Sequence, residues 1–345
     1  MEFRPALDRD ETERRGDSPD AHLDRALRPQ ELRGFIGQGR VVENLQIAIE
    51  AAKQRSEPVD HILLSGLPGL GKTTLAEIVA KEMGTNLRAT SGPVIDKPSD
   101  LAGLLTSLSP GDVLFVDEIH RVPIQVEEYL YSAMEDFRLV IVLDQGPRAR
   151  SVPIQLAPFT LVGATTREGL LSSPFRARFG IHERLDPYPK SDLVAIAERS
   201  AAMLGMPLRG RAAEVLAERS RGTPRLINRY LRRLRDFAQV LGRLEIDEQV
   251  AMNALTRLGV DQAGLLELDR RLLNLLKNSG RPVGLKTLSV ALGEEDRTIE
   301  DVVEPFLIRE GFIEKTPRGR SISAMGLAYL EARRNARPHG TEDAP

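Results

Sequence analysis

The sequence predicts an α/β domain built on a parallel sheet, followed by an all-helical domain and a smaller C-terminal domain. Three observations support this prediction. Between residues 21 and 188, short apolar runs alternate with helical periodicity, which favours a parallel sheet with helices on both faces. Between 189 and 259 the strand signals vanish. Between 260 and 334, helices precede a short segment that contains a Pro/Gly turn.

Composition excludes several classes of protein. The 345 residues include no cysteine, so disulfides and thiolate chemistry are excluded. No apolar run reaches the length of about 18 residues that a membrane span requires, and the N-terminus lacks a signal-peptide pattern, so we expect a cytoplasmic protein. Residues 1–20 and 335–345 are charged and poor in apolar residues, and we expect both tails to be disordered.

Net charge and aromatic content limit the partners. The formal net charge is -2, which by itself does not indicate a polyanionic partner. Aromatic residues make up 4% of the chain and tryptophan is absent, so stacking on single-stranded bases is not expected to dominate.

Three apolar runs are candidate buried strands of the first domain. They are His61–Leu64, Val113–Val116 and Phe159–Val162. Helical patterns fill the spaces between them, as in Leu75–Met83.

A phosphate-binding loop follows the first of these strands. Residues Gly66–Thr73 fit the pattern G-x-x-x-x-G-K-[ST], between a strand and a helix as that motif requires. Glycines let backbone N–H groups approach phosphates, Lys72 brings a positive charge, and the hydroxyl of Thr73 can bind Mg²⁺. The loop predicts a nucleoside triphosphate site.

Two carboxylates end the second candidate strand. Asp117 is predicted to hold Mg²⁺ and Glu118 to polarise the attacking water. His120 completes a D-E-x-H sequence and is interpreted as structural. The absence of an Asn-Lys-x-Asp motif favours ATP over GTP.

Three later segments add candidate groups. Thr165 and Thr166 end the third strand, either facing a phosphate or forming an ordinary β-branched strand end. Two interpretations of Arg178 stay open: an arginine finger that reaches a γ-phosphate, or a solvated surface charge. Arg225 follows Thr223-Pro224, which is also a normal helix start.

Residues 138–156 predict a β-hairpin that is apolar on both faces and inserted before the third strand. Two alternatives stay open, a buried hairpin and an exposed docking site.

The last domain resembles a winged helix. Its expected recognition helix, Asp296–Glu310, carries two basic and five acidic residues, which suits a DNA groove poorly. Basic residues instead gather around the wing turn, at Lys315, Arg318 and Arg320. These three, together with Arg297 at the start of the helix, are the candidates for contacts with the DNA backbone. The segment 199–243 is rich in arginine, with 11 arginines and three acidic residues. We interpret it as a surface that faces a subunit or the nucleotide in part and solvent in part, and direct contact with DNA is the alternative.

Taken together and in this order, these segments resemble the AAA+ ATPase family, and most closely its motors for Holliday-junction branch migration. The resemblance covers about residues 21–330. The stretches that carry it are Leu27–Pro29, Asp60–His61, Gly66–Thr74, Thr90–Pro93, Asp117–Arg121, Ala133–Asp136, Gly163–Arg167, Arg178–Ile181, Gly222–Arg225 and Thr316–Arg320. Leu67 departs from the pattern, which usually has a second proline there.

The resemblance implies roles for particular residues. Thr165 and Thr166 correspond to sensor 1, Arg178 to a finger acting in a neighbouring subunit, and Arg225 to sensor 2. It implies that 189–259 is the ATPase lid. Residues that would contact the nucleotide or Mg²⁺ are Leu27, Arg28, Gly69, Leu70, Gly71, Lys72, Thr73, Thr74, Asp117, Glu118, Glu135, Asp136, Phe137 and Tyr188.

The resemblance also implies partners. We expect ATP and Mg²⁺ as cofactors, a homohexameric ring on duplex DNA, and RuvA docked on the hairpin 138–156, with RuvC resolvase as a further candidate. The alternatives are a clamp-loading or protein-remodelling machine of the same family, and a nucleotide-gated switch. The winged-helix-like domain favours the DNA motor, and the hydrolytic Glu118 disfavours the switch.

Overall fold

The computed structural model describes residues 25–143 and 150–336. These residues form two compact units. The first runs to Leu208 and also includes Gly222–Arg235, and the second comprises Arg209–Arg221 and the chain from Asp236 onward. The division passes through the segment 189–259, which the sequence predicts as one helical domain.

A five-stranded sheet organises the first unit, and all its neighbouring strands are parallel, which confirms the predicted fold class. In spatial order the strands are β2 (Leu87–Ser91), β3 (Val113–Asp117), β6 (Thr160–Thr165), β1 (Ile62–Ser65) and β7 (Ile181–Arg184). The three predicted strands are the central ones. The edge strands β2 and β7 escaped prediction because each contains charged or hydroxyl residues instead of an apolar run.

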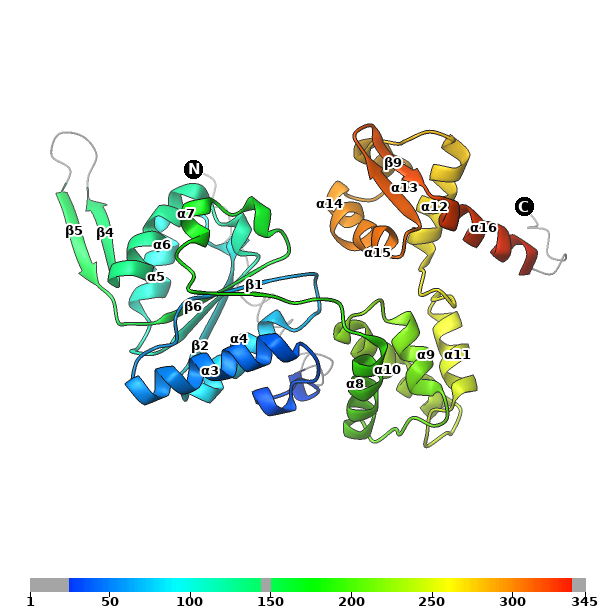
Figure 1. The fold of residues 1–345 in the computed structure, drawn as a ribbon, viewed down its shortest axis with the longest axis horizontal. Coiled ribbons are helices and arrows are strands. Elements are labelled where there is room, and N and C mark those ends of the chain that lie inside the picture. Colours follow the sequence, from blue (N-terminus) through cyan, green and yellow to red (C-terminus); the bar gives the residue numbers. More distant parts are fainter. Residues whose placement is uncertain (1–24, 144–149, 337–345) are drawn as a thin grey trace, which may run out of the picture. The chain divides into compact units, whose positions relative to one another are not determined.

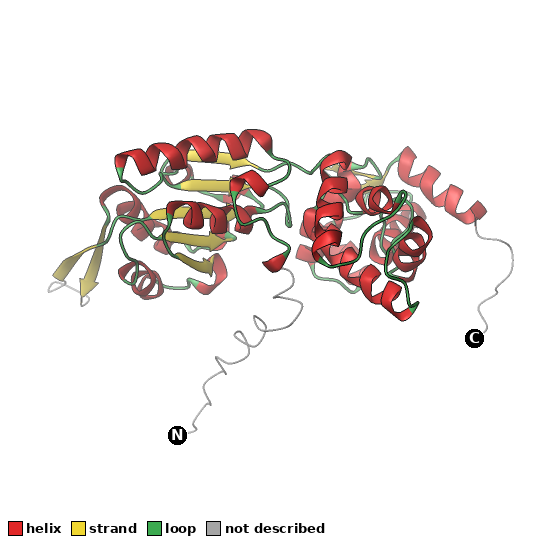
Figure 2. Ribbon diagram, turned by 90° about the horizontal axis from the view of Figure 1, so that it is seen from below, coloured by secondary structure: helices red, strands yellow, loops and turns green. Residues whose placement is uncertain are grey.

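Helices lie on both faces of this sheet (Figure 2). The helices of the first unit before the lid segment are α3 (Gly39–Arg55), α4 (Lys72–Met83), α5 (Pro98–Thr106), α6 (Ile124–Asp136) and α7 (Ser173–Arg176). Short 3-10 turns occur at η1 (Leu32–Gly34), η2 (Gly92–Val94), η3 (Ile119–Arg121) and η4 (Glu168–Leu170). An apolar cluster between the sheet, α5 and α6 includes Leu114, Leu130 and Phe159.

The predicted hairpin is confirmed as a separate two-stranded sheet, β4 (Arg138–Leu143) and β5 (Arg150–Gln155), which projects from the body of the first unit (Figure 1). Its base is buried, since Leu139 and Leu156 belong to the core. Further out, Val140 and Val152 are 36% and 40% exposed. The predicted turn 144–147 lies outside the described residues.

Helices follow the sheet domain, as the sequence predicts for 189–259, and the structure has four of them. They are α8 (Lys190–Met203), α9 (Ala212–Arg219), α10 (Pro224–Val240) and α11 (Glu248–Arg257). Within the second unit, α9 packs against α11.

The C-terminal part of the second unit is a winged helix. Its helices are α12 (Glu267–Ser279), α13 (Leu285–Leu292) and α16 (Ala324–Ala336), and β8 (Ile313–Thr316) pairs antiparallel with β9 (Gly319–Ile322) as the wing. The expected recognition helix forms as α14 (Asp296–Thr298), a π-helical stretch (Ile299–Val303) and α15 (Glu304–Arg309). The π-helical stretch lies just before Pro305, which has no N–H for the helical ladder.

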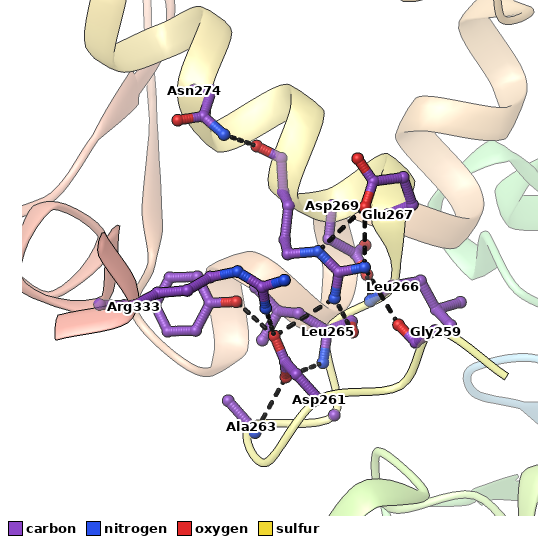
Figure 3. A network of polar contacts seen from close by, with 12 residues as sticks. Gly259, Asp261, Ala263, Leu265, Leu266, Glu267, Asp269, Asn274 and Arg333 are labelled. Carbon is purple, nitrogen blue, oxygen red and sulfur yellow. Dashed lines mark hydrogen bonds and ion pairs between the residues drawn. The ribbon is translucent and has the colours of Figure 1, made fainter. Parts of the chain in front are cut away.

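A carboxylate at the start of this winged helix gathers donors from three segments (Figure 3). Asp261 accepts hydrogen bonds from the backbone of Ala263 and Leu265, from Arg270 and from Tyr329, and it forms an ion pair with Arg333 at 3.1 Å. The loop after α11 is thereby fixed to α12 and α16.

Candidate nucleotide-binding and hydrolysis site

The loop between β1 and α4 has the backbone that a phosphate cradle needs. Gly69 and Gly71 have φ values of 83° and 110°, a region that disfavours side chains. A Cβ atom on Gly69 would lie 2.8 Å from Cβ of Arg225. The glycine therefore lets the start of α10 approach the loop.

Lys72 begins α4 and is 7% exposed. Its ammonium group donates to the carbonyl oxygens of Gly66 and Leu67, at 2.7 and 3.0 Å. The pKa of Lys72 is lowered to about 8, mainly by burial; the carboxylate of Asp117 opposes this decrease and the guanidinium of Arg225 adds to it. Phosphate groups bound in the loop would give this buried ammonium an anionic partner.

The acidic pair lies at the carboxyl end of β3. Asp117 accepts a hydrogen bond from the backbone N–H of Glu118 at 2.9 Å. Glu118 has a φ of 47°, which is strained for a residue with a side chain. Its carboxylate forms an ion pair with Arg121 at 2.7 Å. The strained backbone turns the chain sharply away from the sheet just after Asp117.

Thr165, which ends β6, and Thr166, which follows it, occupy different environments. Thr166 lines the cleft, whereas Thr165 is 1% exposed. The hydroxyl of Thr165 lies 2.9 Å from Nδ1 of His120 and accepts a bond from the N–H of Arg167 at 3.0 Å. His120 thus joins the acidic segment to the end of β6, consistent with its predicted structural role.

The cleft walls come from segments far apart in the sequence. Tyr188 is 6% exposed and donates to the carbonyl of Leu70 at 3.0 Å. Burial raises the pKa of Tyr188 well above its ordinary range, so the hydroxyl remains a donor. Leu27 is buried, and Arg28 pairs with Glu77 at 2.9 Å.

Sequence reasoning missed several lining residues, among them Phe35, Ile36, Ile196 and Asn228. Arg199 is the most informative of the missed residues. It donates to the carbonyls of Gly34 and Leu27 at 2.8 and 3.2 Å, and burial lowers its pKa. None of these residues belongs to a recognisable motif, although the Arg-rich composition of 199–243 was a signal.

Most predicted site residues meet in one cleft of about 230 Å³. They are Leu27, Arg28, Gly69, Leu70, Gly71, Lys72, Thr73, Thr74, Asp117, Glu118, Thr166, Tyr188 and Arg225. The donor set fits a magnesium ion that arrives with a nucleotide. Thr73 and Asp117 offer a hydroxyl and a carboxylate, and no group of three or more metal-ligating side chains occurs among the residues that the structure describes.

Another set of predicted nucleotide contacts lies away from this cleft. Glu135 pairs with Arg178 at 3.2 Å, and Asp136 pairs with Arg138 at 3.5 Å. The ring of Phe137 packs on Phe159, with centroids 5.9 Å apart. None of these residues lines the cleft of its own subunit.

The wing requires a correction to the predicted DNA contacts. Arg320 is only 7% exposed and makes two hydrogen bonds to the buried carboxylate of Glu304, so it is an internal ion pair and not a surface group. Lys315 is half exposed and forms an ion pair with Glu300 at 3.4 Å. Arg297 and Arg318 are exposed. Two of the basic groups therefore neutralise the acidic helix beside them.

Comparison with known proteins agrees with this geometry. Three family models cover the chain in sequence: the Holliday junction DNA helicase RuvB P-loop domain at residues 27–185, the RuvB AAA lid domain at 188–261 and the RuvB C-terminal winged helix domain at 262–331. The chain belongs to the RuvB family.

Individual members of the RuvB family show the extent of the match. A branch migration complex subunit RuvB from Parabacteroides distasonis is 56% identical over 306 residues, which is 88% of this chain and 90% of the relative. The corresponding subunit from Salinibacter ruber is also 56% identical, over 88% and 89% of the two chains. The solved structure of the Thermotoga maritima RuvB branch migration motor is 47% identical, has a TM-score of 0.81 and covers 88% of this chain and 98% of its own.

Across residues 25–143 and 150–336, every helix is too short or too polar to cross a bilayer.

Proposed function

We propose that this chain is the ATP-hydrolysing subunit of a motor that drives branch migration of Holliday junctions. One observation carries the proposal: Lys72, Asp117, Glu118, Thr166 and Arg225 converge on one cleft, in a chain that matches RuvB proteins over nearly nine-tenths of its length.

The cleft residues divide the work of hydrolysis. The loop N–H groups and Lys72 bind the phosphates of ATP, and Mg²⁺ held by Thr73 and Asp117 would neutralise charge on the β- and γ-phosphates. Glu118 orients the attacking water, and Thr166 and Arg225 contact the γ-phosphate. For Glu118, release from Arg121 frees the carboxylate for that task.

Arg178 completes the site of a neighbouring subunit. It does not line the cleft of its own chain, and an arginine supplied from outside stabilises the charge of phosphoryl transfer by about 10³–10⁵-fold in rate. Glu135 and Asp136 are exposed and would contact the neighbour's nucleotide, while the ring of Phe137 packs on Phe159 and holds this segment to the core. A closed homohexameric ring supplies every cleft with such a finger.

Domains and partners follow from the same assignment. Segments 21–188, 189–259 and 260–334 act as the ATPase, lid and DNA-contacting domains. RuvA docks on the exposed outer part of the hairpin, where Val140 and Val152 lie. Arg297 and Arg318 contact the phosphate backbone of duplex DNA without reading sequence.

A branch-migration assay tests the function directly. Full-length protein is incubated with RuvA, ATP, Mg²⁺ and a synthetic four-way junction of unrelated arms, and strand exchange is followed with the ATPase rate. Glu118→Gln should bind ATP normally but lose hydrolysis and migration together. Migration by Glu118→Gln at the wild-type rate would overturn the proposal, and so would an ATPase that ignores both DNA and RuvA.

A further inference from the structure

Arg178 is held in one orientation within its own subunit. Its guanidinium lies over the ring of Tyr131, 4.3 Å from the centroid. Nη1 donates to the carbonyl oxygen of Pro174 at 2.7 Å, and Nη2 forms an ion pair with Glu135 at 3.2 Å. The side chain is 21% exposed. A long side chain that would otherwise sample many rotamers is thereby restricted before any neighbour is present.

The aromatic ring of Tyr131, on which Arg178 packs, is itself held in place. The hydroxyl of Tyr131 donates to Oε2 of Glu127 at 3.1 Å and lies 3.0 Å from Oγ of Ser172. Glu127 is 6% exposed and also accepts a bond from Ser172 at 2.9 Å. The phenol is therefore fixed at its polar end by a buried carboxylate on its own helix.

The same contacts connect α6 to the segment that bears Arg178. Ser172 is the N-cap of α7, because its hydroxyl accepts the N–H of Phe175. Phe175 packs against Tyr131, with ring centroids 5.8 Å apart. Tyr131 thus contacts both ends of this short segment, the cap at its start and the guanidinium at its end.

We propose that Tyr131 is a positioning residue for Arg178, and that it acts on ATP hydrolysis in the neighbouring subunit without touching the nucleotide. The inference rests on the proposed role of Arg178 as a finger in trans. A guanidinium set on a fixed aromatic ring is already oriented when a γ-phosphate comes within reach, so little side-chain entropy is lost on engagement. Glu135, more than half exposed, is the ion-pair partner that the phosphate would replace.

Mixed rings separate this role from a structural one. Acceptor subunits carry Arg178→Ala, so they hydrolyse ATP only when a neighbour supplies the finger. Donor subunits carry Glu118→Gln, so they supply a finger but do not hydrolyse. Donors are then compared with and without Tyr131→Leu, at equal ratios and with duplex DNA present.

We expect Tyr131→Leu in the donor to lower the kcat of the mixed ring by about tenfold, on the scale of a desolvated cation–π contact, with KM for ATP unchanged. The same substitution in the acceptor should have no further effect. Tyr131→Phe in the donor, which keeps the ring, should lose less than Tyr131→Leu. Tyr129→Leu, on the same helix, controls for loss of a tyrosine from α6.

The outcomes distinguish the two proposals. If unmodified Glu118→Gln donors fail to restore activity to Arg178→Ala acceptors, the finger assignment itself is wrong. If restoration occurs but is equal for donors with and without Tyr131→Leu, the role of Tyr131 is refuted. Equal losses in donor and acceptor would also refute it, because they indicate general destabilisation. Thermal unfolding of each variant confirms that the compared subunits are folded.

Discussion

The buried ammonium of Lys72 predicts that nucleotide affinity falls steeply in mildly alkaline solution. In the free protein its pKa is about 8, with burial as the main cause. A bound polyphosphate favours the charged ammonium and raises that pKa. Binding above pH 8 therefore requires uptake of a proton, and the affinity must decrease as pH rises through 8.

The magnitude follows from the titration. With a pKa of about 8, about nine-tenths of free protein carries the charged lysine at pH 7 and about one-tenth at pH 9. If only the charged form binds, affinity drops roughly tenfold over this range, or about 1.4 kcal/mol. Arg225→Ala removes a positive charge that lowers this pKa, so the midpoint of the decrease should move to higher pH.

Equilibrium titration with a fluorescent ATP analogue between pH 7 and 9 measures the effect, and calorimetry in buffers of different ionisation enthalpy counts the protons taken up. Lys72→Arg is the matched control, because a guanidinium stays charged throughout this range. A flat profile for the unmodified protein would refute the reasoning, and so would an equal decrease in Lys72→Arg.

Three further predictions concern other parts of the chain. Arg320→Met should lower the free energy of unfolding in urea by about 3–5 kcal/mol, because it leaves Glu304 charged and buried. Arg318→Ala should leave stability unchanged and reduce the salt slope of DNA binding by about one. Equal unfolding midpoints for the two variants would contradict this. Val152→Asp should abolish RuvA binding in a pull-down yet preserve ATP affinity, since the side chain is 40% exposed. His120→Ala removes the contact with buried Thr165 and should lower the free energy of unfolding by about 1 kcal/mol, with kcat reduced more than ATP affinity. An unaltered kcat would count against a link between the acidic segment and β6.

The sequence predicted those parts of the site that depend on local patterns. A glycine loop, a pair of carboxylates after an apolar run and Thr166 after another lie in one cleft, because parallel strands bring their carboxyl ends to the same edge of a sheet. The central strands could also be predicted from a local pattern, because both their faces are covered and their residues are continuously apolar.

Pairings that form only in three dimensions were not predictable. Counting charges on the wing gave a basic surface, but Arg320 lies opposite Glu304, 16 residues earlier, and the two neutralise each other in the interior. Thr165 and Thr166 could not be separated either, because successive residues at the end of a strand face opposite sides and the sequence does not say which side holds the nucleotide. Arg199 was missed because its partners are backbone carbonyls, which leave no trace in composition.

The donors gathered on Asp261 have a mechanical consequence. A loop of a few residues between two domains would ordinarily be flexible, so that a movement of one domain is only weakly transmitted to the other. Here one carboxylate holds backbone and side-chain groups from the loop, α12 and α16 together (Figure 3). Asp261→Ala would make this loop flexible, so that less of the movement of one domain is transmitted to the next. We therefore expect ATP to be consumed at nearly the normal rate while fewer base pairs are moved per ATP.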